Sequence, residues 1–101
     1  MKTFTFEFEE EKHDRLTYSL EEDETLATSV ENGVPFVCMN RSAMITVAKL
    51  LIKIANGSYS NGFHLHLHKD FNADAPEAVV LMLSAQESKT RQQGRQPSRR
   101  P

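Results

Sequence analysis

The sequence has one cysteine and only four glycines, and each scarcity excludes a class of protein. A single cysteine, Cys38, excludes both an internal disulfide framework and a zinc site built from cysteines. No glycine-rich phosphate-binding loop, nucleophile elbow or zincin motif occurs. No apolar run approaches the length of about 18 residues that a membrane-spanning helix needs. The first ten residues, MKTFTFEFEE, alternate and carry acids, unlike a signal peptide, so we expect a cytoplasmic protein.

Charges of both signs are present, but they are unevenly distributed. Residues 1–85 carry a net charge of −6 and residues 86–101 carry +4, which together give the formal net charge of −2. The acids gather in residues 1–31, which carry a net charge of −7. An acidic surface favours a basic protein partner through electrostatic steering, although solubility alone could account for it. The length favours a single domain over residues 1–85.

The C-terminal segment, residues 86–101, has no large apolar residue and is rich in Gln, Ser, Arg and Pro. Burial cannot offset the ordering entropy of such a segment, so the sequence predicts a disordered basic tail. The tail could contact nucleic acid through four arginines: Arg91, Arg95, Arg99 and Arg100. Because it has no aromatic side chain on which a base could stack, a solvated terminus without a binding role is the favoured interpretation.

The first half of the chain has the alternation typical of strands. Apolar and polar residues alternate with period 2 over residues 4–8, 16–20 and 26–30. Such alternation predicts three half-buried strands. The acids at positions 21–24 lie between two of them and are expected to be solvated at the end of a hairpin.

A tight hairpin is predicted at Asn32-Gly33, because both residues tolerate positive φ. A short strand, Val34–Met39, should follow the turn. Pro35 has no N–H to donate, which favours a position in an edge strand or at a strand start. Cys38 lies between apolar neighbours in this strand, so we expect a buried, inert thiol.

The period then changes to that of a helix. Asn40 can cap a helix over about residues 41–56. Apolar residues cover more than half of its circumference, and Lys49 and Lys53 are expected to mark the solvent side. Gly57 is expected to end the helix in the left-handed conformation.

Two further strands are predicted after the helix, over residues 63–67 and 78–84. The expected fold is therefore α+β, a two-layer sandwich in which a mostly antiparallel sheet of five to six strands packs against one main helix. Val80 and Met82 lie on the sheet face opposite the expected core. That face could be covered by a protein partner, by the tail or by a second copy in a homodimer.

Three histidines, His64, His66 and His68, share one face of a predicted strand. Alternate residues of a strand are about 6.6 Å apart, so two imidazoles and a third ligand from a neighbouring strand could bind zinc. Without a second His or Cys cluster, a row of polar side chains facing solvent or an interface is the favoured interpretation. A catalytic dyad of Cys38 with a histidine would need a proximity that spacing does not establish. We therefore expect a protein without enzymatic activity and without a cofactor, zinc being the one alternative.

Part of the chain resembles a known family. The features are a helix with the sequence AKLLIKIA over residues 48–55, the strand GFHLHL over 62–67, a loop containing Asp70 and Pro76, and the strand VVLML over 79–83. Together, residues 40–83 resemble the immunity protein 32 type family of bacterial polymorphic toxin systems.

This resemblance implies a non-catalytic protein that neutralises a cognate toxin by direct binding. His64 and His66 are the positions that match the family. Glu7, Glu9 and Tyr18 become further candidate contacts if their strands lie beside the histidines on the open sheet face. Acidic contacts would fit a basic toxin domain as the protein partner.

Overall fold

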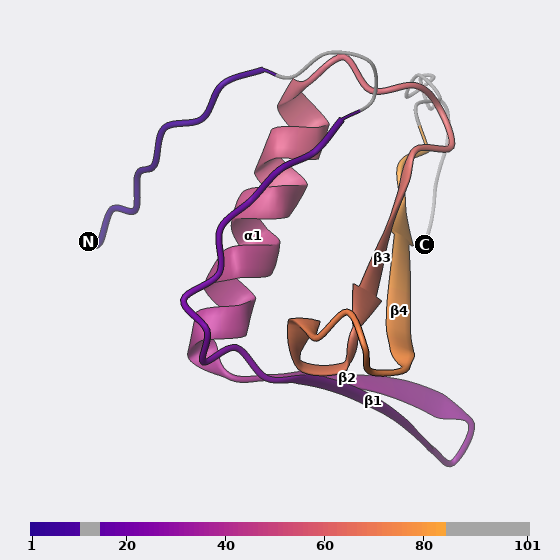
Figure 1. The fold of residues 1–101 in the computed structure, drawn as a ribbon. Coiled ribbons are helices and arrows are strands. Elements are labelled where there is room, and N and C mark those ends of the chain that lie inside the picture. The colour runs from indigo at the N-terminus through magenta and orange to yellow at the C-terminus, as the bar shows by residue number, and fades with distance from the viewer. Residues whose placement is uncertain (11–14, 85–101) are drawn as a thin grey trace, which may run out of the picture.

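The computed structural model describes residues 1–10 and 15–84, so the predicted tail and its four arginines lie outside the described residues. The described part contains one long helix, four strands and one short 3-10 helix (Figure 1). In chain order these are β1 (Leu26–Glu31), β2 (Val34–Met39), α1 (Arg41–Asn56), β3 (His64–His68), η1 (Lys69–Phe71) and β4 (Glu77–Met82). The α+β class is as predicted.

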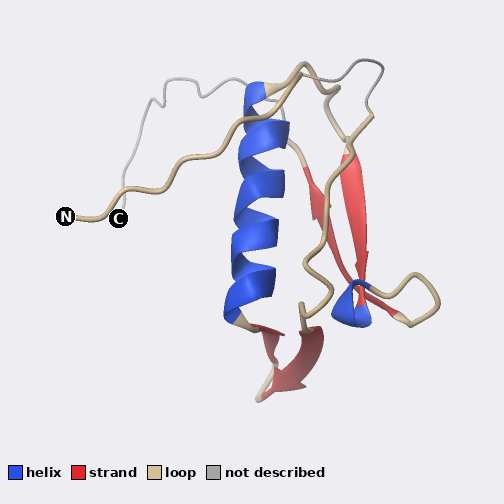
Figure 2. Cartoon of the chain, turned by 60° about the vertical axis from the view of Figure 1, so that its left-hand side comes forward, coloured by secondary structure: helices blue, strands red, loops and turns tan. Residues whose placement is uncertain are grey.

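The strands form two separate antiparallel pairs, β1–β2 and β3–β4 (Figure 2). The predicted sheet of five to six strands is not found in residues 1–10 and 15–84. Residues 4–8 and 16–20 have no strand assignment, and the second of these segments runs along α1 (Figure 1). Alternation indicates which side chains can share a face. A strand also needs a neighbour with free N–H and C=O groups at a matching register, and the sequence does not supply that information.

The β1–β2 hairpin turns as predicted. Asn32 and Gly33 have φ values of 53° and 78°, the paired positive values that suit a two-residue hairpin loop. Pro35 pairs with Val30, in the second residue pair from the loop. In an antiparallel pair of strands, alternate residues point their backbone N–H and C=O groups away from the partner strand, and Pro35 is at such a position. The missing N–H therefore costs no hydrogen bond, which confirms the edge position. Cys38 is exposed, so the expectation of a buried thiol is wrong, because the hairpin projects beyond the core.

Helix α1 begins at the predicted cap. The Asn40 side-chain oxygen accepts from the N–H of Ala43 at 2.9 Å, which confirms the cap, and also from the N–H of Thr25 at 3.1 Å. Its amide nitrogen donates to the C=O of Asp23 at 2.7 Å. One side chain therefore starts the helix and fastens the preceding extended segment to it.

Helix α1 ends at Gly57, but not in the predicted conformation. Gly57 has φ −97° and ψ −175°, which is extended backbone, so the left-handed prediction is wrong. A Cβ added at Gly57 would lie 2.6 Å from the Tyr59 ring. A side chain at this position would force the Tyr59 ring to move away.

The core lies between α1 and the β3–β4 pair, with the start of β1 closing one end (Figure 1). Its fully packed residues are Leu26, Val47, Leu50 and Leu67. The Asp70 carboxylate accepts from the N–H of Leu26 at 2.9 Å and so joins η1 to β1. Within the two described ranges, no helix is long and apolar enough to cross a membrane.

We expect Asn40→Ala to lower the free energy of unfolding by about 1–2 kcal/mol, because alanine removes the helix cap together with the bonds to Thr25 and Asp23. Urea titration measures this loss. The matched control is Asn56→Ala at the other end of α1, where the side chain donates only to the C=O of Ile52. Equal stability losses in the two variants would contradict the joining role of Asn40.

Candidate functional site

A cavity of about 580 Å³ lies along one flank of α1. Its other walls are residues 6–8 and 17–19, which belong to the two segments predicted to be strands, and Glu21, which follows the second of them. Three aromatic side chains line it: Phe6, Phe8 and Tyr18. Tyr18 is 42% exposed and Phe8 38%, so aromatic surface remains available at the edge of the cavity.

Lysines of α1 hold the extended segments in place. The Lys49 ammonium lies 5.9 Å from the ring centre of Phe4 and 5.7 Å from that of Phe6, within cation–π range. The Lys53 ammonium donates to the C=O of Thr17 at 2.6 Å. The sequence predicted that Lys49 and Lys53 mark the solvent side of the helix. This prediction is wrong, because the extended segments cover that flank.

The acidic side of the cavity comes from Glu7 and Glu21, which both line it and are both exposed. The structure thus brings two predicted contact residues, Glu7 and Tyr18, to one cavity. Glu9 is exposed but is not among the lining residues. The result is an aromatic hollow with carboxylates at its border and lysines along its helical wall.

Glu24 shapes the turn beside this cavity. It is only 5% exposed, and its carboxylate accepts from the N–H of Glu21 at 2.8 Å, from the N–H of Glu22 at 3.0 Å and from the Thr46 hydroxyl at 3.0 Å. The hydrogen bond from the Glu21 N–H is the main cause that lowers the pKa of Glu24, and burial opposes it. Within a run of four acids, no sequence signal separates this buried carboxylate from its solvated neighbours.

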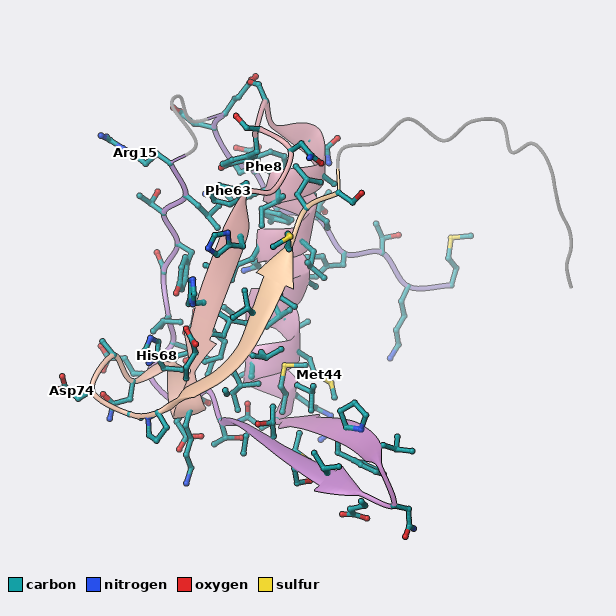
Figure 3. All side chains as sticks on the ribbon, turned by 90° about the vertical axis from the view of Figure 1, so that its right-hand side faces the viewer. Phe8, Arg15, Met44, Phe63, His68 and Asp74 are labelled. Carbon is teal, nitrogen blue, oxygen red and sulfur yellow. The ribbon has the colours of Figure 1, made fainter. Side chains whose placement is uncertain are left out.

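The histidines lie on the other layer of the molecule. Leu67 points into the core, so His64 and His66 occupy the outer face of β3–β4. Their ring centres are 4.8 Å apart in an edge-on arrangement. His68 lies at the end of β3, near the loop that carries Asp74 (Figure 3).

In each of the three histidines, the Nδ1 atom contacts an oxygen atom of a residue in or next to the β3–β4 pair. His64 contacts the C=O of Gly62 at 3.0 Å, and His68 contacts the C=O of Ala75 at 2.8 Å. The Nδ1 atom of His66 contacts the Glu77 carboxylate. No group of three His, Cys, Asp or Glu side chains suited to a metal ion occurs in residues 1–10 and 15–84.

The predicted contact residues therefore fall into two groups, a cavity group with Glu7 and Tyr18 and a sheet-face group with His64 and His66. Sequence analysis missed the residues that build the cavity wall on α1, since lysines on a helix ordinarily face solvent. The comparisons with known proteins are negative. No protein-family model, no curated protein and no solved structure matches the chain.

Acid should destabilise the protein through Glu24. Its carboxylate has a lowered pKa in the folded state, so the ionised form stabilises the fold above the ordinary pKa of 4.5, and this stabilisation is lost as the pH falls through the lowered value. We expect Glu24→Gln to melt at a lower temperature than the wild type at neutral pH. The difference in melting temperature between the two proteins should become smaller at acidic pH.

Thermal melts from neutral to acidic pH, followed by circular dichroism, measure this effect. The control variant Thr46→Val removes only the hydroxyl donor and leaves both backbone donors in place, so it should keep most of the pH dependence. Parallel pH profiles for the wild type and Glu24→Gln would show that the carboxylate does not hold the turn.

Proposed function

We propose that this chain is a non-catalytic, cytoplasmic binding protein that neutralises a basic toxin domain by direct contact. The resemblance of residues 40–83 to immunity proteins suggests this class of function, and the cavity beside α1 supplies a binding surface for it. One observation carries the proposal: exposed aromatic side chains and exposed carboxylates border the same hollow.

The aromatic side chains suit the centre of a protein interface. Tyr18 and Phe8 are partly exposed beside a cavity wide enough to accept side chains of a partner. Tyrosine is frequent among residues that dominate binding energy, because a rigid ring buries a large area and its hydroxyl can still form a hydrogen bond. Tyr18 is therefore the proposed anchor.

The surrounding charge favours a basic partner. Glu7 and Glu21 line the cavity, and Glu9, Glu22 and Asp23 are exposed in the same two segments. Carboxylates at the border of an interface accelerate the approach of a cationic protein and disfavour an anionic one. The Glu21–Glu24 turn is held by hydrogen bonds, so part of this acidic border is already ordered before binding.

The placement of the reactive side chains supports binding over catalysis. Cys38 is opposite Ala27 on the hairpin, and the histidines are on the face of β3–β4 that points away from the core. Within residues 1–10 and 15–84, neither the thiol nor a histidine lines the cavity. A nucleophile and a base acting together would need to be within hydrogen-bond reach of each other.

The direct test takes the protein domain encoded by the gene next to that of this chain and measures its binding by surface plasmon resonance. We expect Tyr18→Ala to weaken binding about 30-fold or more, as loss of an anchor side chain does. Glu7→Lys should slow association several-fold, roughly, with the effect shrinking at high salt. Glu31→Lys, which replaces an exposed acid next to the hairpin turn, is the matched charge control. It should change neither the affinity nor the association rate.

Circular dichroism checks that each variant is folded. A wild-type chain that does not bind the domain would overturn the proposed function. Wild-type affinity in both Tyr18→Ala and Glu7→Lys would instead place the interface elsewhere and overturn the assignment of the cavity.

A second candidate function is zinc binding by His64 and His66. The supporting observation is the engagement of Nδ1 by a backbone carbonyl in His64 and by the Glu77 carboxylate in His66. Metal-binding histidines commonly have this arrangement, because it leaves Nε2 to bind the metal. With the two rings 4.8 Å apart, both Nε2 atoms could reach one ion.

If this pair binds zinc, millimolar zinc should raise the melting temperature by mass action. His66→Ala should abolish the increase, whereas His68→Ala should retain it, since His68 lies at the far end of β3 and contacts Ala75. Differential scanning fluorimetry measures the shift. An unchanged melting temperature in the wild type would remove zinc binding as a function.

A further inference from the structure

The outer face of the β3–β4 pair carries four side chains in a compact block. His64 and Met82 are directly opposite each other in the register, and His66 and Val80 form the next pair on the same face. Residues two apart in a strand share a face, so all four side chains point away from the core. Figure 3 looks onto this face, with the two strands in front of α1.

The ladder brings the thioether of Met82 close to both histidines. The N–H of Leu83 donates to the C=O of Phe63 at 2.8 Å. Because hydrogen-bonded and non-hydrogen-bonded pairs alternate along an antiparallel ladder, the next pair, His64 and Met82, is of the closer, non-hydrogen-bonded kind. Opposed Cβ atoms in such a pair are about 4.5–5.5 Å apart, and a diagonal neighbour is still within reach of a long side chain. Met82 can therefore reach His64 directly and His66 diagonally.

The two imidazole rings are placed to bind one ion. Their centres are 4.8 Å apart. An ion about 2.0 Å from each Nε2 atom holds two ring centres roughly 5 Å apart, so little movement of the side chains is needed. The Nδ1 atoms of His64 and His66 contact an oxygen of Gly62 and of Glu77, which leaves both Nε2 atoms to bind the ion.

The third side chain decides which ion suits this site. Within residues 1–10 and 15–84, no third His, Cys, Asp or Glu joins the two histidines in a metal-binding group. The side chain of Met82 is opposite them and is 67% exposed, so its sulfur is the third ligand on this face. Zinc takes thiolate, imidazole and carboxylate ligands, whereas a thioether is a soft ligand that selects Cu(I). Imidazole also suits copper, so copper is the ion that both ligand types share.

The surroundings of the block favour the singly charged form of copper. Two neutral imidazoles and a thioether carry no charge to balance an ion. Val80, which is 41% exposed, adds apolar surface beside His66. Charge is costly next to apolar surface, and Cu(II) prefers a square arrangement of nitrogen and oxygen ligands. Both arguments favour Cu(I) over Cu(II).

We propose that His64, His66 and Met82 bind one Cu(I) ion through the two Nε2 atoms and the thioether sulfur. The Glu77 carboxylate orients the ring of His66 by its contact with Nδ1. This inference goes beyond the proposed neutralising function, which uses the cavity beside α1. It shares the two histidines with the zinc candidate, but it names a different ion and a third ligand that zinc does not take.

Anaerobic titration of the full chain with the acetonitrile complex of Cu(I), followed by proton–carbon NMR, tests this site. The exposed thiol of Cys38 would also bind Cu(I), so every protein in the test carries Cys38→Ser. We expect the Met82 methyl signal and the ring signals of His64 and His66 to shift together and to saturate at one ion per chain. The methyl signal of Met44, a 54% exposed methionine on α1, is the internal control and should not move.

Met82→Leu should weaken Cu(I) binding about 30-fold or more, because leucine keeps the apolar bulk and removes the soft ligand. Met44→Leu is the matched control and should bind Cu(I) as tightly as the parent chain. Circular dichroism checks that each variant is folded. Histidine signals that do not shift, or equal affinity in Met82→Leu and the parent, would overturn the inference.

Zinc provides a separate readout in the same variants. Any increase in melting temperature that zinc causes in the parent chain should be retained in Met82→Leu, since a thioether is not a zinc ligand. Loss of Cu(I) binding with the zinc effect retained supports the assignment of Met82 as a copper ligand. Loss of both would show that the substitution disturbs the histidines themselves, and it would overturn that assignment.

Discussion

Two polar side chains, Glu24 and Asn40, hold an extended segment against the N-terminal end of α1, and the cavity depends on this junction. Glu24 binds two backbone N–H groups of its own turn and the hydroxyl of Thr46 on the helix. Asn40 caps the helix and binds Asp23 and Thr25. Within the described residues, no strand pairs with this segment, and side chains supply partners that a sheet would otherwise provide. The wall of the cavity is positioned by these contacts.

Helix α1 is the element that all parts of the molecule share. One face packs on the core through Val47 and Leu50. On one side of that face, Lys49 and Lys53 contact the extended segments and line the cavity. On the other side, Met44 and Leu51 remain exposed. A thin domain cannot bury a helix that is apolar over most of its circumference, so part of the apolar surface of α1 stays exposed.

Local signals in the sequence predicted the local structure. The bounds of α1, its Asn40 cap, the Asn32-Gly33 turn and the edge position of Pro35 are all confirmed. These features depend on a few neighbouring residues. Three other predictions were wrong: the larger sheet, the burial of Cys38 and the left-handed conformation of Gly57. Each of these depends on which segments of the chain meet in space. The cavity joins residues more than 30 positions apart, so sequence analysis could propose Glu7 and Tyr18 as candidate contacts but could not predict that they line the same cavity.

The measurement that tests the junction most directly is amide hydrogen exchange of the full chain at neutral pH, resolved by NMR. The N–H groups of Glu21, Glu22 and Thr25 lie outside every helix and strand, and each donates to a side chain of the junction. We predict that they exchange about tenfold or more slowly than in an unstructured peptide. Exchange at the unstructured rate would show that the extended segment is not fastened to α1, and it would remove the physical basis of the cavity.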